Sequence, residues 1–75
     1  MIERAGQLLY GEHFRQVLAR ALEVDGRTLR RWIKDDYLPA DRLDVLYQLL
    51  AERRAAIAAL QHELFRQLYP EERTP

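Results

Sequence analysis

Apolar residues recur at spacings of three and four along most of this 75-residue chain, which is the period of helices that bury one face. The first such segment runs from Ile2 to Tyr10, and Gly11 follows it where a C-terminal glycine cap belongs. Gly6 counts against a helix here, because glycine inside a helix costs about 1 kcal/mol relative to Ala. We still expect a short first helix.

A second apolar stripe lies between residues 12 and 22 and predicts an amphipathic helix of about three turns. Glu12 suits the positive end of the dipole of this helix. The stripe consists of Phe14, Val17, Leu18, Ala21 and Leu22.

A third helix is expected from about Gly26 to Asp35. Asp25 comes directly before it, and the carboxylate of Asp25 can cap the helix by accepting a backbone N–H from the first turn. Leu29, Trp32 and Ile33 share one face, which we assign to the core. The other face is cationic and carries Arg27, Arg30, Arg31 and Lys34.

Pro39 separates this helix from a long fourth one, because the residue before a proline disfavours helical geometry while proline itself suits a first helical turn. No Gly or Pro occurs from Ala40 to about Tyr69, and a continuous helix of this length would span about 45 Å. Its apolar positions follow a seven-residue repeat that only Arg53 interrupts. They are Leu43, Leu46, Leu50, Ile57, Leu60 and Leu64.

A helix of this length exceeds what the core of such a small all-α protein can cover. We expect the part around Leu43, Leu46, Tyr47 and Leu50 to pack on the core, and the remainder to pair with a second copy. Two alternatives stay open, namely a break between residues 52 and 54 that would make a helical hairpin, and a seam buried inside one compact bundle. The expected dimer interface consists of Ile57, Leu60, Leu64 and Leu68.

Charge is balanced overall but uneven along the chain. The formal net charge is zero, which argues against a protein that binds nucleic acid by bulk charge. Residues 1–34 contain seven Lys or Arg and four Asp or Glu, a balance of +3, whereas residues 35–75 contain five and eight, a balance of −3. Positive charge is therefore concentrated in the first half.

The residue types present exclude several classes of function. Without Cys the chain has no disulfide or thiolate metal site, and we expect a cytoplasmic location. No apolar run approaches the ~20 residues that span a bilayer, so no membrane partner is expected. A core of this size contributes only about 3 to 5 kcal/mol, which favours association with a second copy.

The sequence contains few side chains that could carry out catalysis. Ser and Asn are also absent, and apart from four Tyr only Thr28 and Thr74 carry hydroxyl groups. His13 and His62 lie in different predicted helices, with no paired carboxylate or thiol at metal-ligand spacing. We expect no catalytic residue, no metal and no cofactor.

One stretch carries a known pattern. Residues 18–33 read Leu-Ala-Arg-Ala-Leu-Glu-Val-Asp-Gly-Arg-Thr-Leu-Arg-Arg-Trp-Ile, and they resemble the helix-turn-helix of the Cro and lambda-repressor-like superfamily of bacterial and phage regulators. The match includes a small residue, Ala19, where the two helices of the motif cross, then Val24 after the turn. Leu29 and Trp32 anchor the second helix.

The resemblance extends loosely from residue 9 to residue 50 and has one departure. Glu23 stands where the family has Gly in the left-handed conformation, which costs a non-glycine residue about 1 to 2 kcal/mol. The departure affects the tightness of the turn.

The resemblance implies that the second helix of the motif enters the major groove of DNA with its N-terminal residues facing base edges. The groove-facing candidates are Gly26, Arg27, Thr28, Arg30 and Arg31. The phosphate-contacting candidates are Arg15, Gln16 and Lys34. We assign Asp25 to capping, because a free carboxylate there would repel phosphate.

Together these features predict an all-α protein with a helix-turn-helix DNA-binding core in residues 1–50, a dimerising helical extension in 51–69 and a flexible tail in 70–75. The function hypothesis is a sequence-specific regulator of double-stranded DNA, a small repressor of phage or mobile-element type that binds a palindromic operator as a homodimer. The alternative is a helix-turn-helix scaffold that acts on a protein partner, as an interaction module or inhibitor, through its C-terminal helix.

Overall fold

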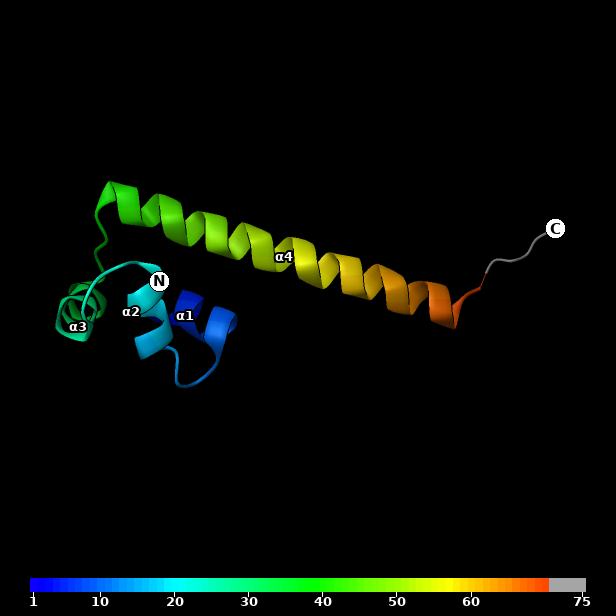
Figure 1. Ribbon diagram of the computed structural model, residues 1–75, viewed down its shortest axis with the longest axis horizontal. Helices are drawn as coiled ribbons and strands as arrows, with labels where there is room; N and C mark the ends of the chain where they lie inside the picture. The colour runs from blue at the N-terminus through cyan, green and yellow to red at the C-terminus, as the bar shows by residue number, and fades with distance from the viewer. Residues whose placement is uncertain (71–75) are drawn as a thin grey trace.

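The computed structural model describes residues 1–70, and this part of the chain contains four α-helices and no strand. The helices are α1 (Ile2–Tyr10), α2 (Arg15–Ala21), α3 (Gly26–Asp35) and α4 (Ala40–Leu68). The three short helices gather on one side of the first half of α4, whose second half extends beyond them (Figure 1). The predicted all-helical class with a long C-terminal helix is confirmed.

α1 ends as the sequence predicts, and its internal glycine has a packing role. Gly11 adopts the left-handed conformation, with φ 84°, and its N–H donates to the Gln7 carbonyl. A Cβ on Gly6 would lie 2.1 Å from a ring carbon of Phe14. The ring therefore packs directly on the backbone of α1, which only glycine allows.

α2 is shorter than predicted. It spans Arg15–Ala21, about two turns instead of three, and Glu12 lies in the preceding turn outside the helix. The chain turns after α1 so that the fully buried Phe14 reaches Gly6, and Phe14 is the N-cap from which α2 begins. Val17, predicted on the apolar stripe, is 40% exposed.

The core is formed by side chains from all four helices and from the segments that connect them. Leu18, Leu22 and Leu29 are almost completely buried at its centre. Trp32 and Ile33 are partly buried against it, as expected for the apolar face of α3. The buried hydrophobic residues are Ile2, Ala5, Leu9, Phe14, Leu18, Ala19, Leu22, Leu29, Leu38 and Leu46.

The first half of α4 packs on α1 through a face that was only partly predicted. Leu46 is buried and Leu50 partly buried, as expected, but Leu43 and Tyr47 are 42% and 68% exposed. Leu49, which the heptad pattern left out, is partly buried instead. The face that meets α1 is set by positions 46, 49, 50 and 53, and residues 43 and 47 turn away from it.

α4 is continuous through residues 52–54, so the chain does not form the helical hairpin. Arg53, which interrupts the apolar repeat, donates from Nη2 to the carbonyl of Leu9 near the end of α1. Pro39 comes just before the helix instead of in its first turn, and its carbonyl accepts the N–H groups of Arg42 and Leu43.

Beyond residue 50 the helix has no cover from the rest of the chain. Every residue from 51 to 70 is exposed. The radius of gyration is 17.1 Å, whereas a compact chain of this length would have about 11 Å. The alternative of a seam buried inside one compact bundle is therefore wrong. The predicted flexible tail lies outside the described residues except for Pro70.

Candidate nucleic-acid interface

The start of α3 is held by the predicted cap. Asp25 is extended, with φ −83° and ψ 168°, and its side chain accepts the N–H of Thr28 at 2.8 Å. The hydrogen bonds from Thr28 lower the pKa of the Asp25 carboxyl below its ordinary value, and the positive charges of Arg27 and Arg31 lower it further. Asp25 therefore stays ionised and caps α3, as assigned.

The connection between α2 and α3 is a tight turn built on a strained residue. Glu23 lies in the left-handed region with φ 61°, the conformation for which glycine was expected. Its N–H donates to the Arg20 carbonyl at 3.1 Å, and the N–H of Val24 donates to the Ala19 carbonyl at 2.9 Å. These bonds offset the cost of about 1 kcal/mol or more for a non-glycine residue and fix α3 against α2.

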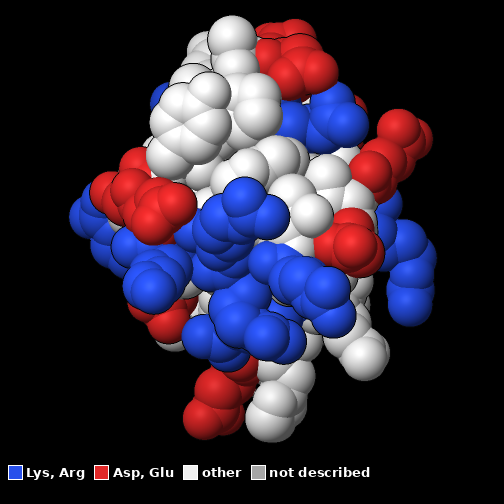
Figure 2. All heavy atoms as spheres, turned by 90° about the vertical axis from the view of Figure 1, so that its left-hand side faces the viewer, with Lys and Arg blue, Asp and Glu red and all other residues white. Residues whose placement is uncertain are grey.

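α3 separates apolar from cationic side chains along its length. Leu29 is 1% exposed on the inner side. The outer side carries Arg27, Arg30, Arg31 and Lys34, all exposed, and these four residues are called the basic face below. Within residues 1–70 none of the four forms an ion pair. Figure 2 shows Lys and Arg side chains gathered on this end of the molecule, with Asp and Glu at the margin.

The predicted base-contacting residues differ in how available they are. Gly26 has open space where a side chain would be, so its backbone is accessible. Thr28 is partly buried and hydrogen-bonded to Asp25, which leaves its side chain less free than predicted. Arg27 and Arg31 are one helical turn apart on the basic face, about 6 Å along the axis.

The predicted phosphate contacts are also unequal. Arg15 is paired with Glu3 at 3.3 Å, and its guanidinium lies 5.0 Å from the centre of the Phe14 ring. Gln16 is exposed at the edge of a shallow hollow between α2 and α3. Lys34 is exposed in the last turn of α3.

Arg20 is a cation that the sequence analysis did not select. It is exposed and lines the same hollow as Gln16 and Gly26. The spacing of four residues from Gln16 to Arg20 was the available signal, because it puts both on one side of α2.

The second half of α4 presents a different kind of surface. Its predicted interface residues are 58%, 58%, 56% and 71% exposed, in the order Ile57, Leu60, Leu64 and Leu68. Phe65 and Tyr69 add two exposed rings with centroids 4.9 Å apart, which the sequence analysis did not single out.

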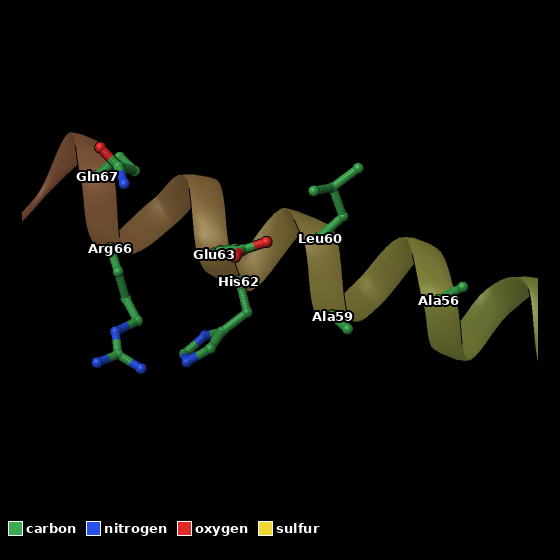
Figure 3. A pocket seen from close by; sticks show the side chains of 7 residues that line it. All are labelled: Ala56, Ala59, Leu60, His62, Glu63, Arg66 and Gln67. Carbon is green, nitrogen blue, oxygen red and sulfur yellow. The ribbon is translucent and has the colours of Figure 1, made fainter.

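A hollow on the same segment encloses no cavity. All of its lining residues come from α4, so it is the open surface of one helix (Figure 3). Leu60 points to the side opposite to His62 and Arg66.

Other kinds of site find no support in the described chain. Residues 1–70 contain no group of three or more His, Cys, Asp or Glu placed to hold a metal ion. None of the helices described combines the length and the apolar composition needed to cross a bilayer. No protein-family model matches the chain, and no curated protein or solved structure matches it either.

Proposed function

We propose that the protein is a sequence-specific regulator that binds double-stranded DNA, with α2 and α3 as a helix-turn-helix motif. The observation that carries this proposal is the basic face of α3. Its four cations are exposed and form no ion pair within residues 1–70, while the opposite side of the same helix is anchored by the buried Leu29. A helix of this kind is rigid and presents its charge outward.

The dimensions of α3 suit the major groove. The groove is about 12 Å wide and admits one α-helix. Arg27 and Arg31 can each donate two hydrogen bonds to guanine O6 and N7, and each such pair contributes about 1 to 3 kcal/mol of discrimination. Gly26, without a side chain, allows the start of α3 to approach the bases closely.

Phosphate contacts would fix the register of α3 in the groove without reading sequence. Lys34 belongs to the basic face, Gln16 and Arg20 lie on the neighbouring α2, and all three are exposed. Arg15 would first have to leave Glu3. A zero net charge is compatible with this role because the positive groups are concentrated at one end.

The regulator would act as a small repressor that blocks polymerase, of the kind found in phages and mobile elements, and it would associate through the second half of α4. A palindromic operator with half-sites about 34 Å apart requires two α3 helices that face the same way.

The test is selection of bound duplexes from a random DNA pool at about 150 mM salt. We expect one sequence to be enriched, and we expect Arg27→Ala/Arg31→Ala to bind it about 100-fold more weakly with unchanged helix content. The matched control, Arg54→Ala/Arg66→Ala, removes the same charge from α4 and should change affinity less than about 3-fold. No enrichment by the natural chain would refute the proposal.

A second candidate function is a protein interaction module, favoured by the exposed apolar side chains of the second half of α4. The two functions predict different salt dependences of binding. DNA binding weakens with a log-log slope of about −0.9 per neutralised phosphate, whereas a partner bound through Leu60 and Leu64 would respond little.

A further inference from the structure

The uncovered apolar side chains of α4 continue the face that α1 covers. Leu46 and Leu50 pack on the short helices, and Arg53 reaches the carbonyl of Leu9. Steps of three and four carry the same face onward through Ile57, Leu60, Leu64 and Leu68. These four exposed residues are called the bare stripe below. The bare stripe begins where α1 ends, on the side of α4 that holds the short helices (Figure 1).

Because the stripe and the short helices lie on the same side of α4, the direction in which a second copy of the chain can cover the stripe is restricted. In a parallel pair the short helices of both copies would lie between the two α4 helices, because they sit on the same side as the stripe. The two sets would compete for one space and hold the stripes apart. In an antiparallel pair each set lies beyond the tip of the other α4, and both stripes are covered.

The stripe is also self-complementary in the antiparallel direction. A two-fold axis near residues 62 and 63 places Ile57 opposite the partner's Leu68, and Leu60 beside the partner's Leu64. The stripe from 57 to 68 is about 17 Å long. That is short for a surface of about 800 Å² per partner, the usual size of a specific interface.

The antiparallel arrangement adds contact area at the tip of each α4. The two-fold axis places position 69 of one copy level with position 56 of the other. A hollow lies there at the junction of α1 and α4, lined by Leu9, Tyr10, Leu49, Glu52, Arg53 and Ala56. A parallel pair would leave this hollow empty.

The position and direction of the basic face in each copy then determine how such a dimer could bind DNA. α3 lies at the end of the molecule away from the tip of α4 (Figure 1), and the view from that end shows the cations facing outward (Figure 2). From the two-fold axis to Ala40 the helix rises about 33 Å, so the two basic ends lie about 65 Å apart. They also face in opposite directions.

We propose that the protein forms an antiparallel dimer through the second half of α4 and bridges two DNA duplexes, one at each end. This inference rests on the proposed DNA binding by α3. The two basic ends of the dimer are separated by about twice the 34 Å of one DNA turn and point away from each other. The dimer would therefore bind two separate half-sites and not adjacent half-sites of one operator.

The arrangement of the copies is tested by disulfide formation, which the absence of native Cys makes unambiguous. Ile57→Cys mixed with Leu68→Cys should give a mixed disulfide at least 10-fold more abundant than either homodimer. In the antiparallel pair the two copies of position 68 lie about 16 Å apart along the axis, whereas a disulfide needs Cα atoms within about 7 Å. Ala55→Cys, on the opposite side of α4, is the control and should form none. Homodimers of Leu68→Cys, or no mixed disulfide, would overturn the arrangement.

Bridging is tested with an immobilised duplex of the selected sequence and a second, fluorescent duplex of the same sequence. We expect the protein to retain the second duplex, and Leu60→Asp/Leu64→Asp to bind the immobilised duplex while retaining at least 10-fold less of the second. Protein bound without the second duplex, or selection of a palindrome with half-sites about 34 Å apart, would overturn bridging and leave DNA binding intact. Protein that binds neither duplex would refute the proposed function itself.

Discussion

The segment from residue 2 to residue 50 and the second half of α4 share one sequence pattern but differ in what covers it. Both repeat apolar residues every three or four positions, and both are helical. In the first segment these side chains form a core in which Phe14, Ile2 and Leu18 are fully buried. In the second, all of them are exposed. Helical periodicity therefore predicts a buried face, but it does not say whether the cover is the same chain or another.

The largest expected effect comes from filling the close contact in the first segment. Gly6→Ala places a Cβ where the Phe14 ring lies, and it should lower the free energy of unfolding by about 3 kcal/mol or more. The measurement is denaturant unfolding followed by circular dichroism.

The matched control is Gly26→Ala, which meets no atom within 4 Å and should change stability by less than about 1 kcal/mol. Equal effects of the two substitutions would show that helix propensity, and not packing against Phe14, determines the change in the free energy of unfolding caused by Gly6→Ala.

The second-largest effect is expected from a substitution that changes the exposed second half of α4 and leaves the core untouched. Leu60→Asp/Leu64→Asp should weaken self-association about 100-fold or more, because it puts charge on the bare stripe, while leaving the unfolding of the core unchanged. Light scattering over a concentration series measures the first, and thermal unfolding at low concentration the second. A variant that stays dimeric would move the interface off this stripe.

Arg53 marks the boundary between the covered and bare parts of α4, and its removal should have a smaller effect. Arg53→Leu leaves the Leu9 carbonyl without this donor and should cost about 1 kcal/mol of stability. Arg54→Leu, one position along, is the control because Arg54 lies off the face that meets α1. Comparable losses in both variants would show that the hydrogen bond from Arg53 to the Leu9 carbonyl does not account for the effect.

The smallest effect concerns pH and the start of α3. The pKa of Asp25 is lowered in the folded protein, so its contribution to stability is present above the ordinary Asp pKa and is lost as the pH falls through the lowered value. Asp25→Asn keeps a cap but should remove this part of the acid dependence, and Asp25→Ala should lower the melting temperature slightly at neutral pH. A melting curve for Asp25→Asn with unchanged acid dependence would assign the effect to another carboxyl.

Much of the local structure could be predicted from the sequence. The bounds of α3, its Asp25 cap and the end of α1 at Gly11 are as expected, because each depends on neighbours within one turn. The left-handed turn at residue 23 was also anticipated, although Glu occupies it. The DNA and dimer assignments remain proposals.

Other features could not be read from local pattern. α2 begins later than predicted because Phe14 must reach Gly6, a contact between two helices. Leu43 and Tyr47 are exposed because α1 lies against a neighbouring face of α4. Arg20 joins the candidate interface only because α2 and α3 form a shared hollow.

The sequence alone is enough to predict that this chain is helical, where α1 and α3 end, and that one helix separates cationic from apolar residues. Hydrogen bonds and side-chain spacing within a few residues are enough for that. Which side of α4 is covered, and where the cover stops, could not be predicted in this way, because both depend on where α1 packs in the folded protein. Since the bare stripe lies on that same side, the packing of α1 also determines which way a second copy can approach.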